Sequence, residues 1–251
     1  SLSEDQQLGW VMPKNADRLQ DAQKFWFERF DKSGQFVVIS DRYYGHYEIF
    51  DYVNIRAFHR RIRQRLPKYR KLFESASDKY EIPWTMLAAQ SYQESHWNPR
   101  AKSPTGVRGL MMLTLTTARS MGYKSRLSPE NSVMGGARYL KKLLSQVSPN
   151  VKPAERIWFA LAAYNVGMGH IHDAQLLAHE LGKNPYEWHE LKTVLPLLSQ
   201  KKFYKKLKYG YARGTEPVRY VQRIREFKDI LDQQTTFEIE ILGADDVSEK
   251  L

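Results

Sequence analysis

Most apolar positions beyond residue 50 recur every three or four residues, which is the spacing of amphipathic helices. Ile55, Phe58, Ile62 and Leu66 form one such stripe, and Pro67 marks its end. Further helices are predicted from the stripes that begin at Tyr69, Trp84, Val133, Trp158, Ile171 and Val221. This succession of stripes predicts a mainly α domain.

The helix that is predicted to start at Pro83 differs from the others because its apolar residues lie on all sides. Proline suits the first turn of a helix, and Asn98 with Pro99 ends this one. A helix that is apolar all round is typical of a protein interior. We therefore expect this helix to lie at the centre of the fold.

The first 48 residues form a different kind of segment. The range 17–30 is helix-like, Ser33 and Gly34 favour a turn, and 36–39 is a short apolar run that predicts a strand. About 45 residues of this kind make a poor independent core. We expect residues 1–48 to be a small α/β remnant of a larger domain, and residues 49–251 to be the main helical domain.

The end of the chain alternates apolar and acidic positions. Phe237, Ile239 and Ile241 alternate with Glu238 and Glu240, which is the two-residue period of a β-strand. The sequence therefore predicts a short C-terminal strand after the last long helix, as an addition to the mainly α domain.

Positive charge is concentrated in two runs of a chain whose net charge is +11. Arg56 to Lys71 holds eight basic residues and no acidic one, and Lys201 to Arg213 holds five lysines and one arginine. Such runs suit a polyanionic partner: nucleic acid, an anionic membrane surface or an anionic glycan. The first run has a second interpretation, because its arginines also occupy the polar face of an amphipathic helix.

The chain contains no cysteine, which excludes a disulfide scaffold, a zinc ribbon and a cysteine nucleophile. Hydrophobic residues make up 42% of the sequence, which is enough to exclude bulk disorder. No apolar run approaches a membrane span, and no signal peptide is present. Because the chain does not begin with methionine, we expect it to be a processed or trimmed fragment.

One carboxylate, Glu94, lies in the last turn of the helix that is predicted to be buried. Burying an ionised carboxylate costs free energy unless the group is paired or lines a cleft. Burial also raises a carboxyl pKa, which is what a general acid needs near neutral pH. Glu94 is therefore a candidate catalytic acid, and the alternative is a structural ion pair with one of the many lysines and arginines.

The segments after Glu94 carry motifs that resemble the catalytic domain of soluble-type lytic transglycosylases. The resemblance covers roughly Lys68 to Leu231 and rests on these motifs, in the family's order and spacing: Glu94-Ser95, Asn98-Pro99, Ser103 with Gly106, Gly109-Leu110-Met111, Ala163-Tyr164-Asn165, and Glu216 with Tyr220. It implies a goose-type lysozyme-like, mainly helical fold and the cleavage of peptidoglycan, with no cofactor and no metal ion.

The resemblance implies that Glu94 is the single catalytic acid. Glu94 would protonate the glycosidic oxygen between N-acetylmuramic acid and N-acetylglucosamine, and would then take the proton of the muramic C6 hydroxyl as a 1,6-anhydro ring closes. The acetamido group of the substrate would replace the second carboxylate that most glycosidases use. The residues implied to bind substrate are Ser103, Gly109, Met111, Met112, Tyr164, Asn165, Glu216 and Tyr220.

The sequence departs from the family pattern at two places beside the predicted substrate groove. Met112 stands where the family usually has glutamine, and Thr114-Leu115 stands where many members have a Met-Pro pair. These differences affect the predicted subsite contacts more than the chemistry of Glu94. Met111 and Met112 also have a simpler interpretation as core residues, and Glu216 has one as an acid in the first turn of a helix.

The leading segment, residues 9–45, resembles the tail of a family 3 periplasmic solute-binding domain. A solute-binding-like domain before this catalytic domain is the arrangement of a membrane-bound branch of the family. That arrangement implies a peripheral location on the periplasmic face of the outer membrane. It also implies peptidoglycan strands and muropeptides as partners, no nucleic acid, and a regulatory peptide as the ligand of the rest of the first domain.

Two other functions stay open on the sequence alone. A lysozyme-like muramidase would use the same acid on the same bond, but water would attack in place of the C6 hydroxyl. A basic helical domain that binds nucleic acid would present the two basic runs on one continuous face, with an affinity that falls steeply with salt. The second alternative gives no role to Glu94 and the loop that follows it.

Overall fold

The computed structural model describes residues 13, 15–43 and 52–248 of the 251-residue chain. The chain divides into two compact units, Ser1–Gly45 and His46–Leu251, and each is described by itself. Within the described residues the secondary structure is helical, and the only β-structure consists of isolated bridges in one loop. The predicted mainly α class is therefore confirmed.

The first unit contains α1 (Asp17–Lys32) and α2 (Gln35–Tyr43), joined by a turn in which Gly34 has a φ of +71°. Trp26 and Phe30, one turn apart on α1, stack with ring centroids 4.8 Å apart. The predicted strand at 36–39 is wrong, because these residues lie within α2. A run of four apolar residues fits a helix and a strand equally well by periodicity, and no described strand is present to pair with it.

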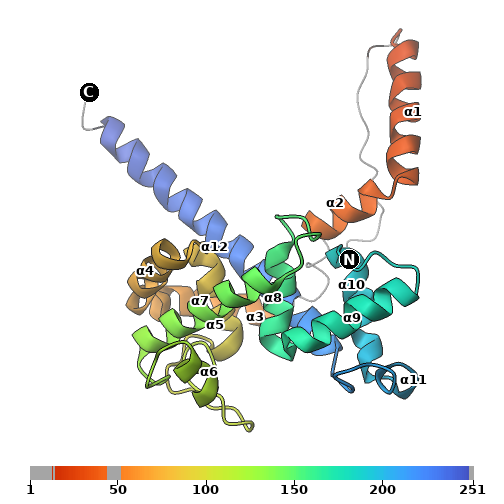
Figure 1. Ribbon diagram of the computed structural model, residues 1–251. Coiled ribbons are helices and arrows are strands. Elements are labelled where there is room, and N and C mark those ends of the chain that lie inside the picture. Colours follow the sequence, from red (N-terminus) through yellow and green to blue (C-terminus); the bar gives the residue numbers. More distant parts are fainter. Residues whose placement is uncertain (1–12, 14, 44–51, 249–251) are drawn as a thin grey trace. The chain divides into compact units, whose positions relative to one another are not determined.

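The second unit is a set of helices that surround one hydrophobic core (Figure 1). Its elements are α3 (Tyr52–Gln64), η2 (Leu66–Lys68), α4 (Arg70–Tyr80), α5 (Trp84–Ser95), α6 (Leu115–Ser120), α7 (Pro129–Gln146), α8 (Arg156–Val166), α9 (Met168–Glu180), α10 (Trp188–Val194), η3 (Leu195–Ser199), α11 (Lys201–Tyr204) and α12 (Thr215–Ser248). Pro83 immediately precedes α5, as predicted, and Pro129 is the first residue of α7.

Helix α5 lies at the centre of this unit, as its all-round apolar pattern predicts. Every residue from Thr85 to Tyr92 is buried. Helix α5 packs against α12 and α4, and α12 in turn packs against α8. Because α5 is enclosed on most sides, the few polar groups on it must find partners inside the protein.

Aromatic side chains close the core beside α5. The ring of Phe58 on α3 lies 4.4 Å from that of Tyr92 and 4.6 Å from that of Phe227 on α12, measured between centroids. Trp97, which is 1% exposed, donates a hydrogen bond of 2.9 Å from Nε1 to the carbonyl oxygen of Ala88. These contacts fix the C-terminal end of α5, where Glu94 lies.

The predicted C-terminal strand is wrong. Residues 237–241 continue α12, which runs without a break from Thr215 to Ser248. A helix that is already formed gains one hydrogen bond for each residue added, whereas a lone strand has no partner to pair with. Three apolar positions in alternation with two acidic ones are too short a pattern to overcome this difference.

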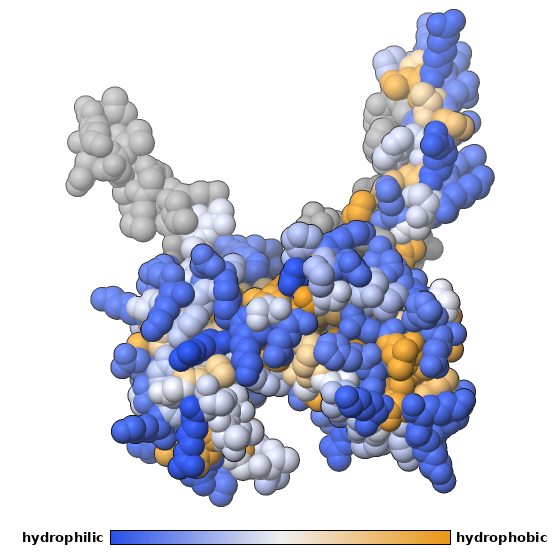
Figure 2. Space-filling view, viewed as in Figure 1, coloured by the Kyte–Doolittle hydropathy of each residue, from blue (hydrophilic) through white to orange (hydrophobic). Residues whose placement is uncertain are grey.

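The surface of the second unit is mostly polar in the view of Figure 2, and it is hollowed between the part that carries α6 and the part that carries α11. Exposed apolar side chains include Leu176 and Leu181, which are 53% and 44% exposed. Across the described ranges, every helix is too short or too polar to cross a lipid bilayer.

Candidate active site

Glu94 lies in the last turn of α5, one residue before the helix ends at Ser95. The chain leaves the helix through His96 and Trp97, whose φ angles of 52° and 55° are in the left-handed region. This sharp exit turns the following loop back toward α5. Burial raises the pKa of the Glu94 carboxyl to about 7, so the protonated and ionised forms are present in comparable amounts in neutral solution.

Tyr220, on α12, is the hydrogen-bond partner of Glu94. The Tyr220 hydroxyl donates to Oε1 of Glu94 over 2.5 Å, and the tyrosine is 5% exposed. The bond favours the ionised carboxylate and so opposes the effect of burial on the pKa of Glu94. Burial and the nearby negative charge of Glu94 raise the pKa of Tyr220 well above its usual value, so Tyr220 remains a donor.

Gln90, one turn before Glu94 on α5, completes this hydrogen-bonded group. Its Nε2 donates to the Tyr220 hydroxyl oxygen over 3.3 Å, and its side chain is 0% exposed. A hydroxyl has a single proton, so a tyrosine that accepts from Gln90 has that proton available for Glu94. The sequence analysis did not identify Gln90, although a lone amide four residues before Glu94 in an apolar helix is a signal that could have found it.

Tyr164, on α8, is a second tyrosine near Glu94. Its hydroxyl donates to the carbonyl oxygen of Met111 over 2.8 Å. Burial raises the pKa of Tyr164 well above its usual value, and the charges of Glu94 and Tyr139 raise this pKa further. Tyr164 therefore lies within electrostatic reach of Glu94, and it holds the loop that carries Met111.

The backbone of this loop is held by serine hydroxyls from two helices. Ser91 and Ser95 of α5 both donate to the carbonyl oxygen of Leu110, over 3.1 and 2.9 Å. The backbone N–H of Met111 donates to the hydroxyl of Ser132 on α7 over 3.1 Å. All three serines are buried, so each hydroxyl needs a hydrogen-bond partner inside the protein, and each finds it in the backbone of this loop.

Gly109 is required for this arrangement. Its φ is +86°, and a Cβ at this position would lie 2.2 Å from the carbonyl oxygen of Arg126 and 2.8 Å from the Ser132 hydroxyl. Gly136 on α7 is close to the same loop, because a Cβ there would lie 2.7 Å from Cβ of Met111. Gly109 thus allows the loop to approach Arg126 and Ser132 closely, and Gly136 leaves room on α7 for the Met111 side chain.

The two methionines of the loop differ in environment. Met111 is 0% exposed, so its side chain belongs to the core, and its backbone carbonyl oxygen accepts the hydrogen bond from Tyr164. Met112 is partly exposed and has a φ of 46°, which is unusual for a residue with a side chain. Met112 stands where the family pattern has glutamine, and its contact with substrate stays a prediction.

The remaining sequence-predicted site residues lie nearer the surface. The Ser103 hydroxyl pairs within its own turn, with the Thr105 hydroxyl at 2.8 Å and the Val107 N–H at 3.3 Å. Asn165 is exposed beside Tyr164 at the end of α8. Glu216, in the first turn of α12, forms an ion pair of 3.4 Å with Arg213. Their roles in binding substrate stay predictions.

Glu94 is a proton donor or acceptor with an organised environment. It combines a pKa of about 7, a fixed tyrosine donor and a loop wall that is locked to three helices. Within the described residues, no group of three or more histidine, cysteine, aspartate or glutamate side chains is arranged to hold a metal ion. A carboxyl with a pKa of about 7 and a fixed tyrosine donor is suited to general acid and base catalysis.

Comparison with known proteins finds a recognised domain in the part of the chain that contains Glu94 and Tyr164. Residues 71–186 match the family described as the Transglycosylase SLT domain. The chain is 50% identical over 233 residues to membrane-bound lytic murein transglycosylase F of Shewanella loihica. The aligned region covers 92% of this chain and 48% of the relative. The protein of the same name from Hahella chejuensis is 47% identical over 233 residues, and the aligned region covers 92% of this chain and 46% of the relative. The chain spans about half the length of the curated relatives it matches.

A solved structure supports the same fold. The X-ray structure of an inactive mutant of lytic transglycosylase Slt from Pseudomonas aeruginosa superposes with a TM-score of 0.51. It is 21% identical in sequence and covers 67% of this chain and 24% of that chain. The predicted lysozyme-like, mainly helical fold of the main domain is confirmed by this likeness.

Proposed function

We propose, from the premise that residues 71–186 belong to the transglycosylase SLT domain family, that this chain is a peptidoglycan lytic transglycosylase with Glu94 as its single general acid and base. The bond cleaved is the β-1,4 bond from N-acetylmuramic acid to N-acetylglucosamine. The observation that carries the proposal is the Glu94 carboxyl, which has a pKa of about 7 and a bond to Tyr220.

The first half of the reaction uses the protonated form of Glu94. Its proton passes to the glycosidic oxygen as the bond from that oxygen to the muramic C1 breaks, and N-acetylglucosamine leaves with a free hydroxyl. Glu94 is then an ionised carboxylate. The bond from Tyr220 favours this form, so Tyr220 lowers the cost of giving up the proton in a buried setting.

The second half uses Glu94 as a base. The muramic C6 hydroxyl gives its proton to Glu94 as its oxygen bonds to C1, which closes the 1,6-anhydro ring and restores the protonated enzyme. No water is consumed. Attack by a group that is already held in place can save about 7 to 11 kcal/mol at its best, which favours the C6 hydroxyl over solvent.

The surroundings of Glu94 support a mechanism with one carboxylate. Burial and Tyr220 are the causes of its pKa shift, and no second carboxylate among the described residues contributes. The candidate that is nearest to Tyr220 in sequence, Glu216, is paired with Arg213. A hydrolase of the lysozyme type would share Glu94, so the two reactions differ in their products rather than in this residue.

Replacement of the acid tests the proposal. Glu94→Gln keeps the shape of the side chain, removes the transferable proton, and is expected to abolish cleavage of purified murein while circular dichroism stays unchanged. Glu226→Gln is a matched control, because Glu226 is also a buried glutamate, with a pKa raised to about 8, but is not in the site. Substantial turnover by Glu94→Gln, or equal loss in both variants, would overturn the assignment.

We also propose a setting for this activity. The enzyme would work at the periplasmic face of the outer membrane, and the names of the membrane-bound relatives support the membrane association. The leading unit would be the tail of a solute-binding-like domain, whose remainder binds a regulatory murein peptide. Titrating murein peptides against the full-length protein tests this regulation: a change in cleavage rate with saturation is expected, and no change at saturating peptide would contradict it.

A further inference from the structure

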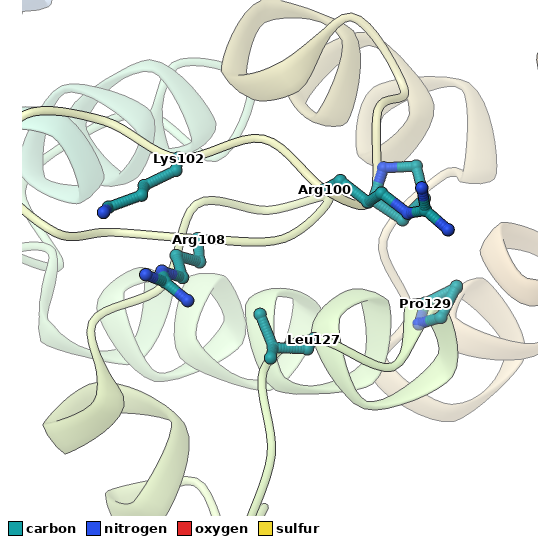
Figure 3. Close-up of a pocket in the computed structure, with 6 residues that line it drawn as sticks. Arg100, Lys102, Arg108, Leu127 and Pro129 are labelled. Carbon is teal, nitrogen blue, oxygen red and sulfur yellow. The ribbon is translucent and has the colours of Figure 1, made fainter.

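A pocket of about 500 Å³ lies beside the loop that walls the active site, and three cationic side chains line it. Figure 3 shows Arg100, Lys102 and Arg108 around this pocket, with Leu127 and Pro129 along its edge. Pro99 completes the lining, and no acidic residue belongs to it. A concave site with several cations and no acid is suited to a negatively charged ligand.

Two of the three cations are held side by side by the backbone. Lys102 and Arg108 face each other across an isolated antiparallel bridge, and Figure 3 shows their side chains on the same side of the loop. Like charges directly opposite each other across such a bridge repel. An anion bound between the two side chains would offset this repulsion. The paired cations of the bridge therefore favour the binding of an anion in the pocket.

The end of the pocket adds further positive potential. Pro129 is the first residue of α7, a helix of 18 residues, and the side chain of the N-cap residue Ser128 makes no capping hydrogen bond. The N-terminus of a helix carries partial positive charge and favours anions. Leu127 and the two prolines provide apolar surface for the uncharged part of a ligand.

The pocket is joined to the active site by the chain itself. Arg108 directly precedes Gly109, and its backbone pairs with that of Leu113 through hydrogen bonds of 3.2 and 3.1 Å. The stretch between them carries the Leu110 carbonyl that Ser95 holds beside Glu94. The pocket lining and the residues that Ser95 holds therefore belong to one continuous stretch of chain, which follows directly after Glu94.

We infer that this pocket binds a carboxylate of the peptide stem that murein carries on its muramic acid residues. The inference rests on the proposed function. The sugar rings of such a strand are uncharged, whereas the stem peptides end in free carboxylates. Arg108 and Lys102 would bind a carboxylate through charge-assisted hydrogen bonds, and Arg100 would add to the field. The pocket would thus make the enzyme favour strands that carry acidic stems.

Binding to a soluble muropeptide tests the pocket without catalysis. In a Glu94→Gln background, the titrant is a disaccharide tetrapeptide, compared with the same compound after its carboxylates are converted to amides. We expect the free acid to bind about tenfold more tightly, and the pair Lys102→Gln with Arg108→Gln to abolish this difference. The pair Lys205→Gln with Lys206→Gln removes two exposed charges elsewhere and should preserve it.

The outcomes separate this inference from the proposed function. Equal binding of the free acid and the amide by the unaltered pocket would overturn the pocket assignment. An equal loss of preference for the free acid in the pocket double variant and in the Lys205→Gln, Lys206→Gln control would also overturn it. On murein itself, the pocket pair should raise KM about tenfold with little change in kcat, and amidated murein should abolish that effect. If the wild-type chain binds the acid selectively but releases no product from murein, the function fails and the pocket stands.

Discussion

Tyr220 donates a hydrogen bond of 2.5 Å to Glu94 across 126 positions of the chain, and this contact joins α12 to α5 at the candidate acid. Burial alone would leave Glu94 protonated and a poor base, whereas a fully ionised carboxylate could not act as an acid. The bond from Tyr220 counteracts burial and sets the pKa to about 7. A carboxyl with that pKa can work in both directions near neutral pH.

The pH dependence of the reaction follows from this pKa. Cleavage needs protonated Glu94, so kcat/KM for murein should be flat at acidic pH and fall above about pH 7, approaching tenfold per pH unit. Because the bond from Tyr220 lowers the pKa of Glu94, Tyr220→Phe should move the fall to higher pH while it reduces the maximal rate. Profiles of kcat/KM for both proteins should be measured between pH 5 and pH 9. This range of ~4 pH units covers the flat part of each profile and its fall.

Tyr92→Phe is a suitable control for the tyrosine variant. The Tyr92 hydroxyl accepts a hydrogen bond of 2.8 Å from Arg61. Tyr92 is not among the groups that shift the pKa of Glu94. Its profile should keep the wild-type midpoint. A Tyr220→Phe profile with an unchanged or lowered midpoint would contradict the role given to Tyr220.

A single methyl group on Gly109 should displace the loop from α7. Gly109→Ala combines an unfavourable φ with a Cβ placed 2.2 Å from the Arg126 carbonyl oxygen, so we expect a loss of about 3 kcal/mol or more in the free energy of unfolding, together with most of the activity. Gly106→Ala has a similar φ of +84° but meets nothing within 4 Å, and it should cost only about 1 kcal/mol. Urea unfolding compares the two, and equal costs would mean that the close approach to Arg126 and Ser132 is not what requires glycine.

Glu226 should make the protein less stable as the pH rises. Its pKa is raised from 4.5 in the unfolded reference to about 8, chiefly by burial. Below the lower value both states hold the proton. Between the two values only the folded state keeps it, so stability falls with pH and then levels off above about 8.

Glu226→Gln removes this titration. The variant should match the wild type near pH 4 and exceed it by about 1–3 kcal/mol near pH 8, as measured by urea unfolding at the two pH values. Part of the decline should remain in the variant, because Glu94 titrates with the same sign. A variant that is less stable than the wild type at pH 8 would contradict the buried, protonated state of Glu226.

The helical half of the fold could be predicted from the sequence because its signals are long. The all-round apolar pattern of α5 identified the buried helix, and with it the unusual position of Glu94. The two strand predictions failed at 36–39 and 237–241, where four or five residues fit either period and long-range packing decides. The two arginines Arg61 and Arg65 are partly structural, since they donate to the Tyr92 hydroxyl and to the His96 carbonyl oxygen.

The site was only partly readable from the sequence. Motifs gave Glu94, Tyr164 and Tyr220, but the pairing of Tyr220 with Glu94 depends on how α12 crosses α5, which no local pattern encodes. Gln90 was missed because its role exists only through Tyr220. The basic pocket was missed for the same reason, since Lys102 and Arg108 become neighbours only when the loop pairs with itself.

The mass of the products from purified murein tests the central claim most directly. If Glu94 takes its second proton from the muramic C6 hydroxyl, mass spectrometry of a complete digest should find anhydro-muropeptides, each lighter by one water than the reducing-end muropeptide that a lysozyme releases. The Glu94→Gln variant should release neither product. A digest dominated by reducing-end muropeptides would contradict the account, because water and not the sugar hydroxyl would then be the attacking group.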